Sequence, residues 1–191
     1  MKSLYFGLAC VAAMIISAFS FANHTEAPLI VVVDAGHGGK DPGYEDEHHI
    51  EKALTLAWSN ELVALSNSQV VYVPLRKGDE FISLRDRVNR INAIKADRVI
   101  SLHLHDSEKP EWEIRYKDEE ASEATTEFRD EFSLELQAHN QEVKVLPMNS
   151  YLLKNSEAPA LLISIPQKAE GIEVEKSKDW AKKVHSALSE K

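Results

Sequence analysis

Residues 31–39 constrain the fold more than any other part of the chain. They read Val-Val-Val-Asp-Ala-Gly-His-Gly-Gly, an apolar β-branched run that ends in a glycine-rich turn. Such a run favours a buried strand, and closely spaced glycines favour a turn with unusual backbone angles. The pattern therefore predicts that the imidazole of His37 lies at the carboxyl end of a strand, where open α/β sheets keep their ligand sites.

Strand and helix patterns alternate along the chain. Apolar runs predict four buried strands, at residues 29–34, 70–75, 97–102 and 159–165. Apolar residues at helical spacing predict four helices, at residues 49–65, 83–94, 121–140 and 173–188. This order predicts βαβ units in a single α/β domain with a mostly parallel, twisted sheet flanked by helices.

Three shorter segments are weaker strand candidates. Apolar residues at 112, 114 and 116 alternate with charged ones, which indicates an edge strand. Residues 143–146 and 151–154 are the other two candidates.

Length and charge limit the classes of function. With 191 residues the chain has room for one ordinary domain. Its formal net charge is −9, and its basic residues form no cluster in the sequence. This balance argues against nucleic acid and anionic lipid surfaces as partners.

The first 22 residues are predicted to be a secretory signal peptide. Lys2 precedes an apolar run over residues 4–19, and small residues at 20 and 22 allow cleavage after Ala22. The run is shorter than the roughly 20 residues that a spanning helix needs. We therefore expect a mature domain over residues 23–191, periplasmic or secreted, with no membrane span after signal removal.

A metal in the mature domain would need ligands other than cysteine. Cys10 is the only cysteine and lies inside the predicted signal. His37, Glu51 and His103 are expected to converge from a turn, the first turn of a helix and the end of a strand. Two imidazoles and one carboxylate with an open fourth position are typical of catalytic zinc. Taken singly, His37 could be an ordinary turn residue, and Glu51 could serve only the helix dipole.

Several motifs carry a resemblance to a known family. The matching residues are 33–43 (Val-Asp-Ala-Gly-His-Gly-Gly-Lys-Asp-Pro-Gly), Glu51-Lys52, Arg76, Asp79, Leu84, Arg87, Asn92, Ala96-Asp97, Ser101-Leu102-His103, Asn155 and Pro159–Leu162. In these the chain resembles the zinc-dependent N-acetylmuramoyl-L-alanine amidases of bacterial cell walls (Amidase_3 type). The resemblance implies Zn²⁺ bound by His37, Glu51 and His103, with peptidoglycan as the partner and a monomeric protein. The bond cleaved would join the lactyl group of muramic acid to the first L-alanine.

Two positions depart from that family. Its members end the last strand with a glutamate that serves as general base and acid, and the matching residue here is Ser164. Serine does not accept a proton from water at neutral pH, and losing acid–base help typically costs about 10²–10⁴ in rate. Glu170, Glu173 and His105 are the candidate substitutes; His105 stands where the family usually has asparagine.

Three hypotheses follow for the function. The first is an exported zinc amidase of this class, impaired by Ser164 or using a substitute base. The second is a catalytically inactive, metal-holding homologue that binds peptidoglycan or regulates its turnover. The third is a related amidohydrolase acting on another substrate, and no residue is assigned to substrate binding.

Two arginines in the matching positions are expected to be structural. Arg76 and Arg87 each have an acidic neighbour in sequence, Asp79 and Asp86 respectively. We expect ion pairs between them rather than contacts with a substrate.

Overall fold

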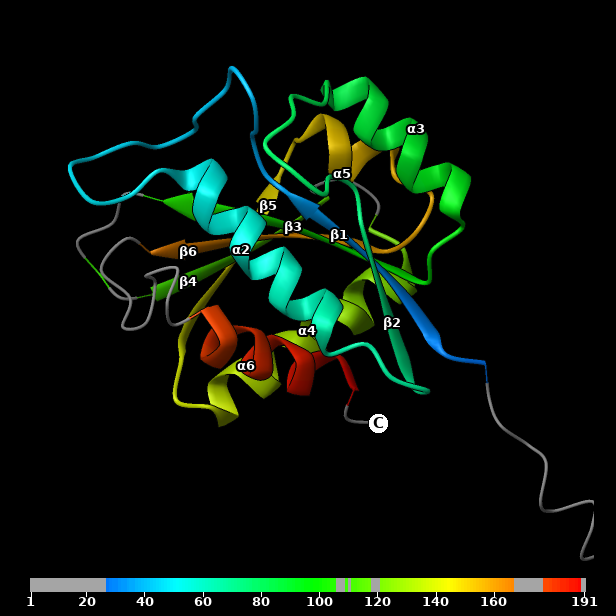
Figure 1. The fold of residues 1–191 in the computed structure, drawn as a ribbon. Helices are drawn as coiled ribbons and strands as arrows, with labels where there is room; N and C mark the ends of the chain where they lie inside the picture. The colour runs from blue at the N-terminus through cyan, green and yellow to red at the C-terminus, as the bar shows by residue number, and fades with distance from the viewer. Residues whose placement is uncertain (1–26, 106–108, 110, 118–120, 167–176, 190–191) are drawn as a thin grey trace, which may run out of the picture.

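A computed structural model describes residues 27–105, 109, 111–117, 121–166 and 177–189. The predicted signal peptide, residues 1–22, and the candidate bases Glu170 and Glu173 lie outside the described residues. The described part contains one α/β unit built on a six-stranded sheet (Figure 1).

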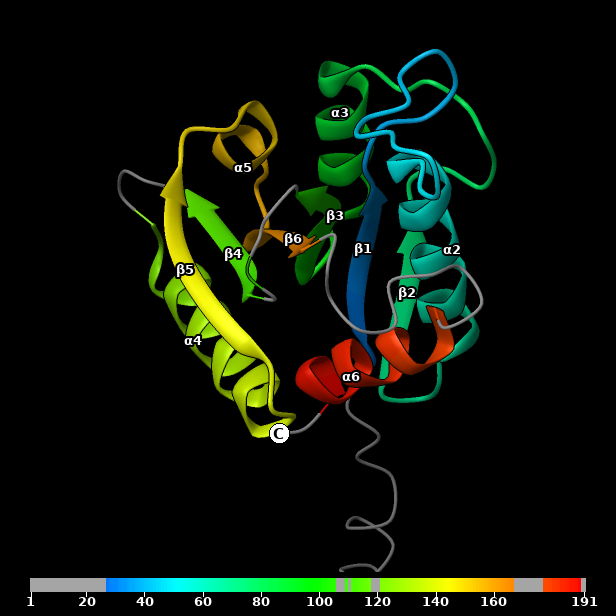
Figure 2. The same ribbon diagram turned by 90° about the vertical axis from the view of Figure 1, so that its left-hand side faces the viewer.

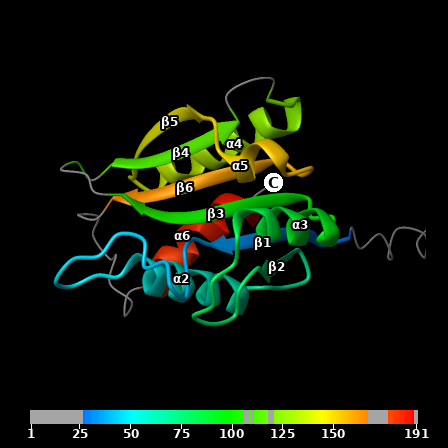
Figure 3. The same cartoon turned by 90° about the horizontal axis from the view of Figure 1, so that it is seen from above.

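The sheet has the order β2-β1-β3-β6-β4-β5, which Figure 3 shows from the side of α3 and α5. The strands are β1 (Leu29–Ala35), β2 (Val70–Pro74), β3 (Arg98–His105), β4 (Glu111–Lys117), β5 (Glu142–Met148) and β6 (Ala160–Pro166). β2, β1, β3 and β6 are parallel, β4 is antiparallel to β6, and β5 is parallel to β4. The predicted mostly parallel sheet is therefore confirmed.

Helices cover both faces of the sheet (Figures 1 and 2). One face carries α2 (Glu51–Ala64), α4 (Glu123–Ala138) and α6 (Ser177–Ser189). The other carries α3 (Leu84–Ile94) and the short α5 (Tyr151–Asn155). Apolar residues cover both faces of β1 and β3 because each face is packed against helices.

Three tryptophans join the larger core. The ring of Trp180 on α6 is stacked against Trp58 on α2 and Trp112 on β4, with centroids 5.1 and 6.0 Å apart. All three rings are buried. This stack fastens the last described helix to the first helix and to the antiparallel half of the sheet.

Two details of the predicted elements are wrong. Residues 151–154 were expected to form a strand, but they lie in the helix α5. Leu152 and Leu153 are both buried against the sheet, and two adjacent residues share one face of a helix more readily than of a strand. The strand around residue 114 exists as β4, but it lies inside the sheet because β5 takes the edge.

The length and hydrophobicity of the helices can be compared with those of a membrane span. Within the described part of the chain, none is both long enough and apolar enough to span a bilayer.

Candidate metal centre

The three predicted ligands meet where β1 and β3 end and α2 begins. His37 follows β1, Glu51 is the first residue of α2, and His103 lies near the end of β3. One ligand atom from each residue lies within 4.8 Å of the other two. Among the described residues, this is the one cluster of histidine, cysteine or acidic side chains with such geometry.

Glycines leave the space into which these side chains fit. A Cβ atom on Gly36 would lie 2.6 Å from Cε1 of His103. A Cβ atom on Gly43 would lie 2.5 Å from Oε2 of Glu51, and Gly43 has a φ of 69° that side chains disfavour. His37 itself has a φ of 60°, so the turn holds it in the left-handed region. Without glycine at these two places the ligands would be displaced.

Glu51 joins the two histidines through a single oxygen. Its Oε1 lies 3.1 Å from Nε2 of His37 and 2.9 Å from Nδ1 of His103. The amide of Leu104 also donates to Oε1, and the amide of Tyr44 donates to Oε2. Burial opposes ionisation of Glu51, but these hydrogen bonds outweigh it and hold the pKa of the carboxyl far below its usual range. Glu51 is thus a fixed carboxylate.

Asp41 fixes the orientation of His37. Its Oδ2 lies 3.0 Å from Nδ1 of His37, so the opposite nitrogen, Nε2, is presented to Glu51. The hydrogen bond to Glu51, against the opposing effect of burial, raises the pKa of His37, and Asp41 adds to the rise. A carboxylate on the second ring nitrogen is the usual support of a metal-binding histidine.

Two buried arginines hold the turn that carries His37. Arg76 donates to the carbonyl oxygens of Ala35 and Gly36, and Arg87 donates to those of Ala35 and His37. Arg87 also pairs with Asp34, whose other oxygen accepts a hydrogen bond from Ser101. The arginines are therefore structural, as expected.

Their expected acidic partners were wrong. Among the described ion pairs, Asp79 binds Lys52, and Asp86 accepts a hydrogen bond from Ser83. The side chains of Asp79 and Asp86 are exposed, whereas both guanidinium groups turn inward to backbone carbonyls at the end of β1 and in the glycine-rich turn.

The donor set suits a borderline cation such as zinc. Two imidazole nitrogens and a carboxylate oxygen converge, and one ring is braced by a second carboxylate, as in two-histidine, one-glutamate zinc sites. Oε1 of Glu51 contacts both histidine nitrogens directly, and a bound cation would replace those two contacts with metal–ligand bonds.

A cleft of about 370 Å³ opens beside these ligands on the α3 side of the sheet. His37, His103 and Asp41 contribute to its polar wall. Its apolar wall comprises Phe81, Ile82, Leu84, Leu152 and Leu162. Phe81 and Leu84 remain exposed, so the apolar wall extends to the surface. The cleft can hold a molecule with both a polarisable group and apolar parts.

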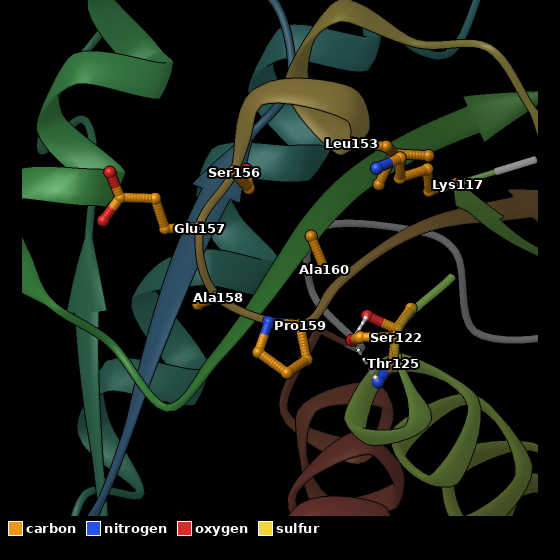
Figure 4. Close-up of a pocket in the computed structure, with 9 residues that line it drawn as sticks. All are labelled: Lys117, Ser122, Thr125, Leu153, Ser156, Glu157, Ala158, Pro159 and Ala160. Atoms are coloured by element: carbon orange, nitrogen blue, oxygen red, sulfur yellow. Dashed lines mark hydrogen bonds between the residues drawn. The ribbon is translucent and has the colours of Figure 1, made fainter. Parts of the chain in front are cut away.

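A second, smaller cavity of about 170 Å³ lies at the other end of β6 (Figure 4). It is bounded by Lys117, the start of α4 and the segment leading into β6. Ser122 and Thr125 point toward each other there, because Ser122 caps α4. None of the metal-centre residues lines this cavity.

Ser164 lies directly beside His103. Ser164 is paired with His103 in the register between β6 and β3, and Ser164 is buried. Ile163 and Ile165 pack into the core under α2, so Ser164 points to the opposite face, the one occupied by His103 and the cleft. Position 164 therefore faces the site but carries no carboxylate.

His105 lies two residues beyond His103 and outside the group of three ligands. Its Nε2 contacts the carbonyl oxygen of Glu111 at 3.2 Å. Glu113, which sequence reasoning missed, pairs with Ser164 across β4 and β6 on the same face. The alternation of side chains along β4 predicts that Glu113 points to the other face of the sheet from Trp112 and Ile114. It does not predict that Glu113 lies beside Ser164, which depends on the register of the strands.

Fold and site together define an α/β domain with two histidines and one glutamate, arranged so that they could hold a metal ion, at the carboxyl edge of its sheet. The Amidase_3 family, described as N-acetylmuramoyl-L-alanine amidase, matches residues 31–190, so the chain belongs to this family.

Individual relatives agree with this assignment. The chain is 37% identical over 99 residues to the probable N-acetylmuramoyl-L-alanine amidase AmiB of Haemophilus influenzae, covering 50% of this chain and 23% of that protein. It is 26% identical over 153 residues to N-acetylmuramoyl-L-alanine amidase LytC of Bacillus subtilis, covering 74% of this chain and 30% of that protein. The chain thus spans less than a third of either relative.

Solved structures support the fold. The catalytic domain of the amidase CwlV from Paenibacillus polymyxa superposes with a TM-score of 0.73 at 22% identity, covering 84% of this chain and 96% of that domain. An N-acetylmuramoyl-L-alanine amidase from Clostridium difficile 630 gives 0.73 at 23% identity, covering 85% and 96%. The described domain therefore has the fold of these domains.

Proposed function

We propose that the chain is an exported, zinc-dependent N-acetylmuramoyl-L-alanine amidase. It hydrolyses the amide between the lactyl group of muramic acid and the first L-alanine of peptidoglycan. The observation that carries the proposal is the convergence of His37, Glu51 and His103 beside the cleft of a family member.

In this proposal the three ligands hold zinc, and Asp41 keeps His37 turned toward it. When bound, zinc supplies a Lewis acid that activates water and polarises a carbonyl. The apolar wall, including Leu152 and Leu162, would contact the hydrocarbon parts of the substrate beside the scissile amide. Arg76 and Arg87 stay outside this chemistry because they are buried in holding the turn.

The first test measures zinc content and the release of peptide from purified peptidoglycan on one sample of residues 23–191. The parent is expected to bind about one zinc and to release peptides with a new N-terminal alanine. His37→Ala should lose both. His139→Ala, a change of an exposed histidine that caps the C-terminal end of α4, serves as the control and should keep both. A zinc-loaded parent that releases nothing would overturn the proposal.

A second candidate function is metal-dependent wall binding without turnover. Ser164 favours it, because the position paired with His103 in the neighbouring strand carries a hydroxyl instead of a carboxylate. It predicts that zinc-loaded protein co-sediments with peptidoglycan but releases no peptide. Ser164→Glu then creates hydrolysis, and Ser164→Gln, of the same size without the charge, does not.

Export is a further part of the proposal. We propose that a signal at residues 1–22 directs the chain out of the cytoplasm and is cleaved after Ala22, leaving a monomer. N-terminal sequencing of the protein recovered from the periplasm or medium should begin at Asn23. Light scattering should give the mass of one chain. Recovery of the uncleaved chain from the cytoplasm would contradict the proposed export and signal cleavage.

A further inference from the structure

Hydrolysis at the metal centre needs a group that takes a proton from the attacking water and returns one to the leaving amine. The described carboxylates closest to the ligands already have other roles. Asp34 binds Arg87 and Ser101, Asp41 holds the ring of His37, and Glu51 joins both histidines. None of these three is available for proton transfer without dismantling the site.

Glu113 is a fourth carboxylate, brought toward the site by strand register. It is directly opposite Ser164, and Ser164 is directly opposite His103, so the three form one row across β4, β6 and β3. Directly opposed residues point to the same face of a sheet, and neighbouring strands lie about 4.8 Å apart. The Cα atoms of Glu113 and His103 are therefore roughly 10 Å apart.

The side chain of Ser164, between Glu113 and His103, is small and fills little of the distance between them. A glutamate and a histidine that lean toward one another across a serine span most of that distance, and one water can bridge the remainder. Ser164 is only 5% exposed and Glu113 only 8% exposed, so the row is sheltered from bulk solvent. Glutamate is rarely buried in proteins unless its carboxylate is paired with a positively charged or hydrogen-bonding group.

Arg115 is that partner. It lies two residues along β4 on the same face, and its Nε donates to Oε2 of Glu113 over 2.9 Å, with a second contact from Nη2. The side chain of Arg115 is 31% exposed, whereas that of Glu113 is 11% exposed. Both contacts are made to Oε2, so the arginine steadies the carboxylate without using Oε1.

We propose that Glu113 is the catalytic acid–base residue of this chain, acting from β4 where β6 offers only Ser164. This inference rests on the proposed amidase function. The water oxygen bonds to the amide carbon while one of its protons passes to the Glu113 carboxylate. The C–N bond then breaks, and the same proton passes to the departing nitrogen. The products are a lactyl carboxylic acid, which releases the second proton of the water to solvent and becomes a carboxylate, and a free alanine amine. No other reactant is consumed.

The test compares Glu113→Gln with Glu111→Gln, a matched change on the same strand and face. Glu111 lies 3.9 Å from Lys144 and its side chain has no role in the row. We expect Glu113→Gln to lower kcat about 10²–10⁴-fold with KM and zinc content unchanged. Glu111→Gln should keep the parent rate. Adding Ser164→Glu to Glu113→Gln should restore turnover, because it returns a carboxylate to the row nearer to His103.

A second measurement does not depend on turnover. In protein labelled with ¹³C at glutamate carboxyls, the Glu113 resonance is identified by its absence from the Glu113→Gln spectrum. Adding zinc to the metal-free protein should shift this resonance and leave that of Glu111 in place. A resonance that does not move would overturn the proposal, since a purely structural pair with Arg115 would not sense the metal centre.

The outcomes separate the two proposals. If the parent hydrolyses peptidoglycan and Glu113→Gln is equally active, the role of Glu113 is overturned and the amidase function stands. If the zinc-loaded parent is inert and Ser164→Glu is active, both proposals fall and the binding function is favoured.

Discussion

The Nδ1 atom of His37 and the Oδ2 atom of Asp41 illustrate how much of this centre depends on one supporting contact. The contact, 3.0 Å long, decides which ring nitrogen faces Glu51. Carboxylates in this role typically contribute 10–100-fold in metal affinity. Asp41 is also largely open to solvent, with 45% of its side chain exposed, so its removal does not disturb the core.

Asp41→Asn is therefore expected to weaken zinc binding by roughly 10–100-fold while leaving the fold intact. The measurement is zinc affinity by competition with a chromogenic chelator. Glu47→Gln, which removes an exposed carboxylate from the same loop, should leave the affinity unchanged. Equal affinities for the two variants would mean that Asp41 does not support the ligand.

The convergence of His37, Glu51 and His103 could be predicted because each residue has a local signature. A glycine turn after an apolar run marks His37, a helix start marks Glu51, and the end of a buried strand marks His103. The place of Glu113 could not be predicted in this way. It depends on how β4 aligns with β6, which lies about fifty residues later in the chain, and local alternation carries no information on such a register.

At the scale of elements, α3 matters because it delivers Arg87 to the turn. The helix begins at Leu84, and Oγ of Ser83 accepts a hydrogen bond from the amide of Asp86 while donating to its carboxylate. A serine, Ser150, also precedes α5 as its N-cap residue, but its side chain makes no capping hydrogen bond. The two serines thus form a natural pair for comparison.

Ser83→Ala should lower the free energy of unfolding by about 1 kcal/mol, because an amide at the start of α3 loses its acceptor. Ser150→Ala should change it by less than about 0.5 kcal/mol. Urea unfolding followed by circular dichroism gives both values. Similar losses in the two variants would show that the cap of α3 contributes nothing particular.

The long helices and the four strands of the parallel half could be predicted because their apolar patterns extend over many residues. The short elements could not. Tyr-Leu-Leu-Lys suits a strand by composition, yet it forms α5, since Leu152 and Leu153 must both reach the sheet. Likewise, nothing within β4 reveals that β5 would cover its outer edge.

For the molecule as a whole, the metal centre links stability to pH. Glu51 has a folded pKa below its ordinary value of 4.5, so its contribution is present above that value and lost as pH falls. His37 has a folded pKa above its ordinary value of 6.5, so its contribution is complete below 6.5 and lost as pH rises through the raised value. In the metal-free protein both contributions are complete only between pH 4.5 and 6.5.

Zinc should reverse the alkaline side of this profile. Zinc requires neutral imidazoles, so its affinity and its stabilisation increase as His37 loses its proton. At about 100 times the Kd, zinc adds about 2.7 kcal/mol to the free energy of unfolding. Urea midpoints between pH 4 and 9, with and without zinc, provide the check. His37→Asn should abolish the zinc-dependent part, and a zinc effect that weakens with rising pH would contradict this linkage.

The stack formed by Trp58, Trp180 and Trp112 has a spectroscopic consequence. The chain has three tryptophans, and all of them belong to this stack. Intrinsic fluorescence therefore reports one event, the seating of α6 between α2 and β4, and nothing in the cleft on the other face of the sheet. An emission change on unfolding marks the loss of that contact, whereas an exogenous probe at the cleft is needed to follow a ligand.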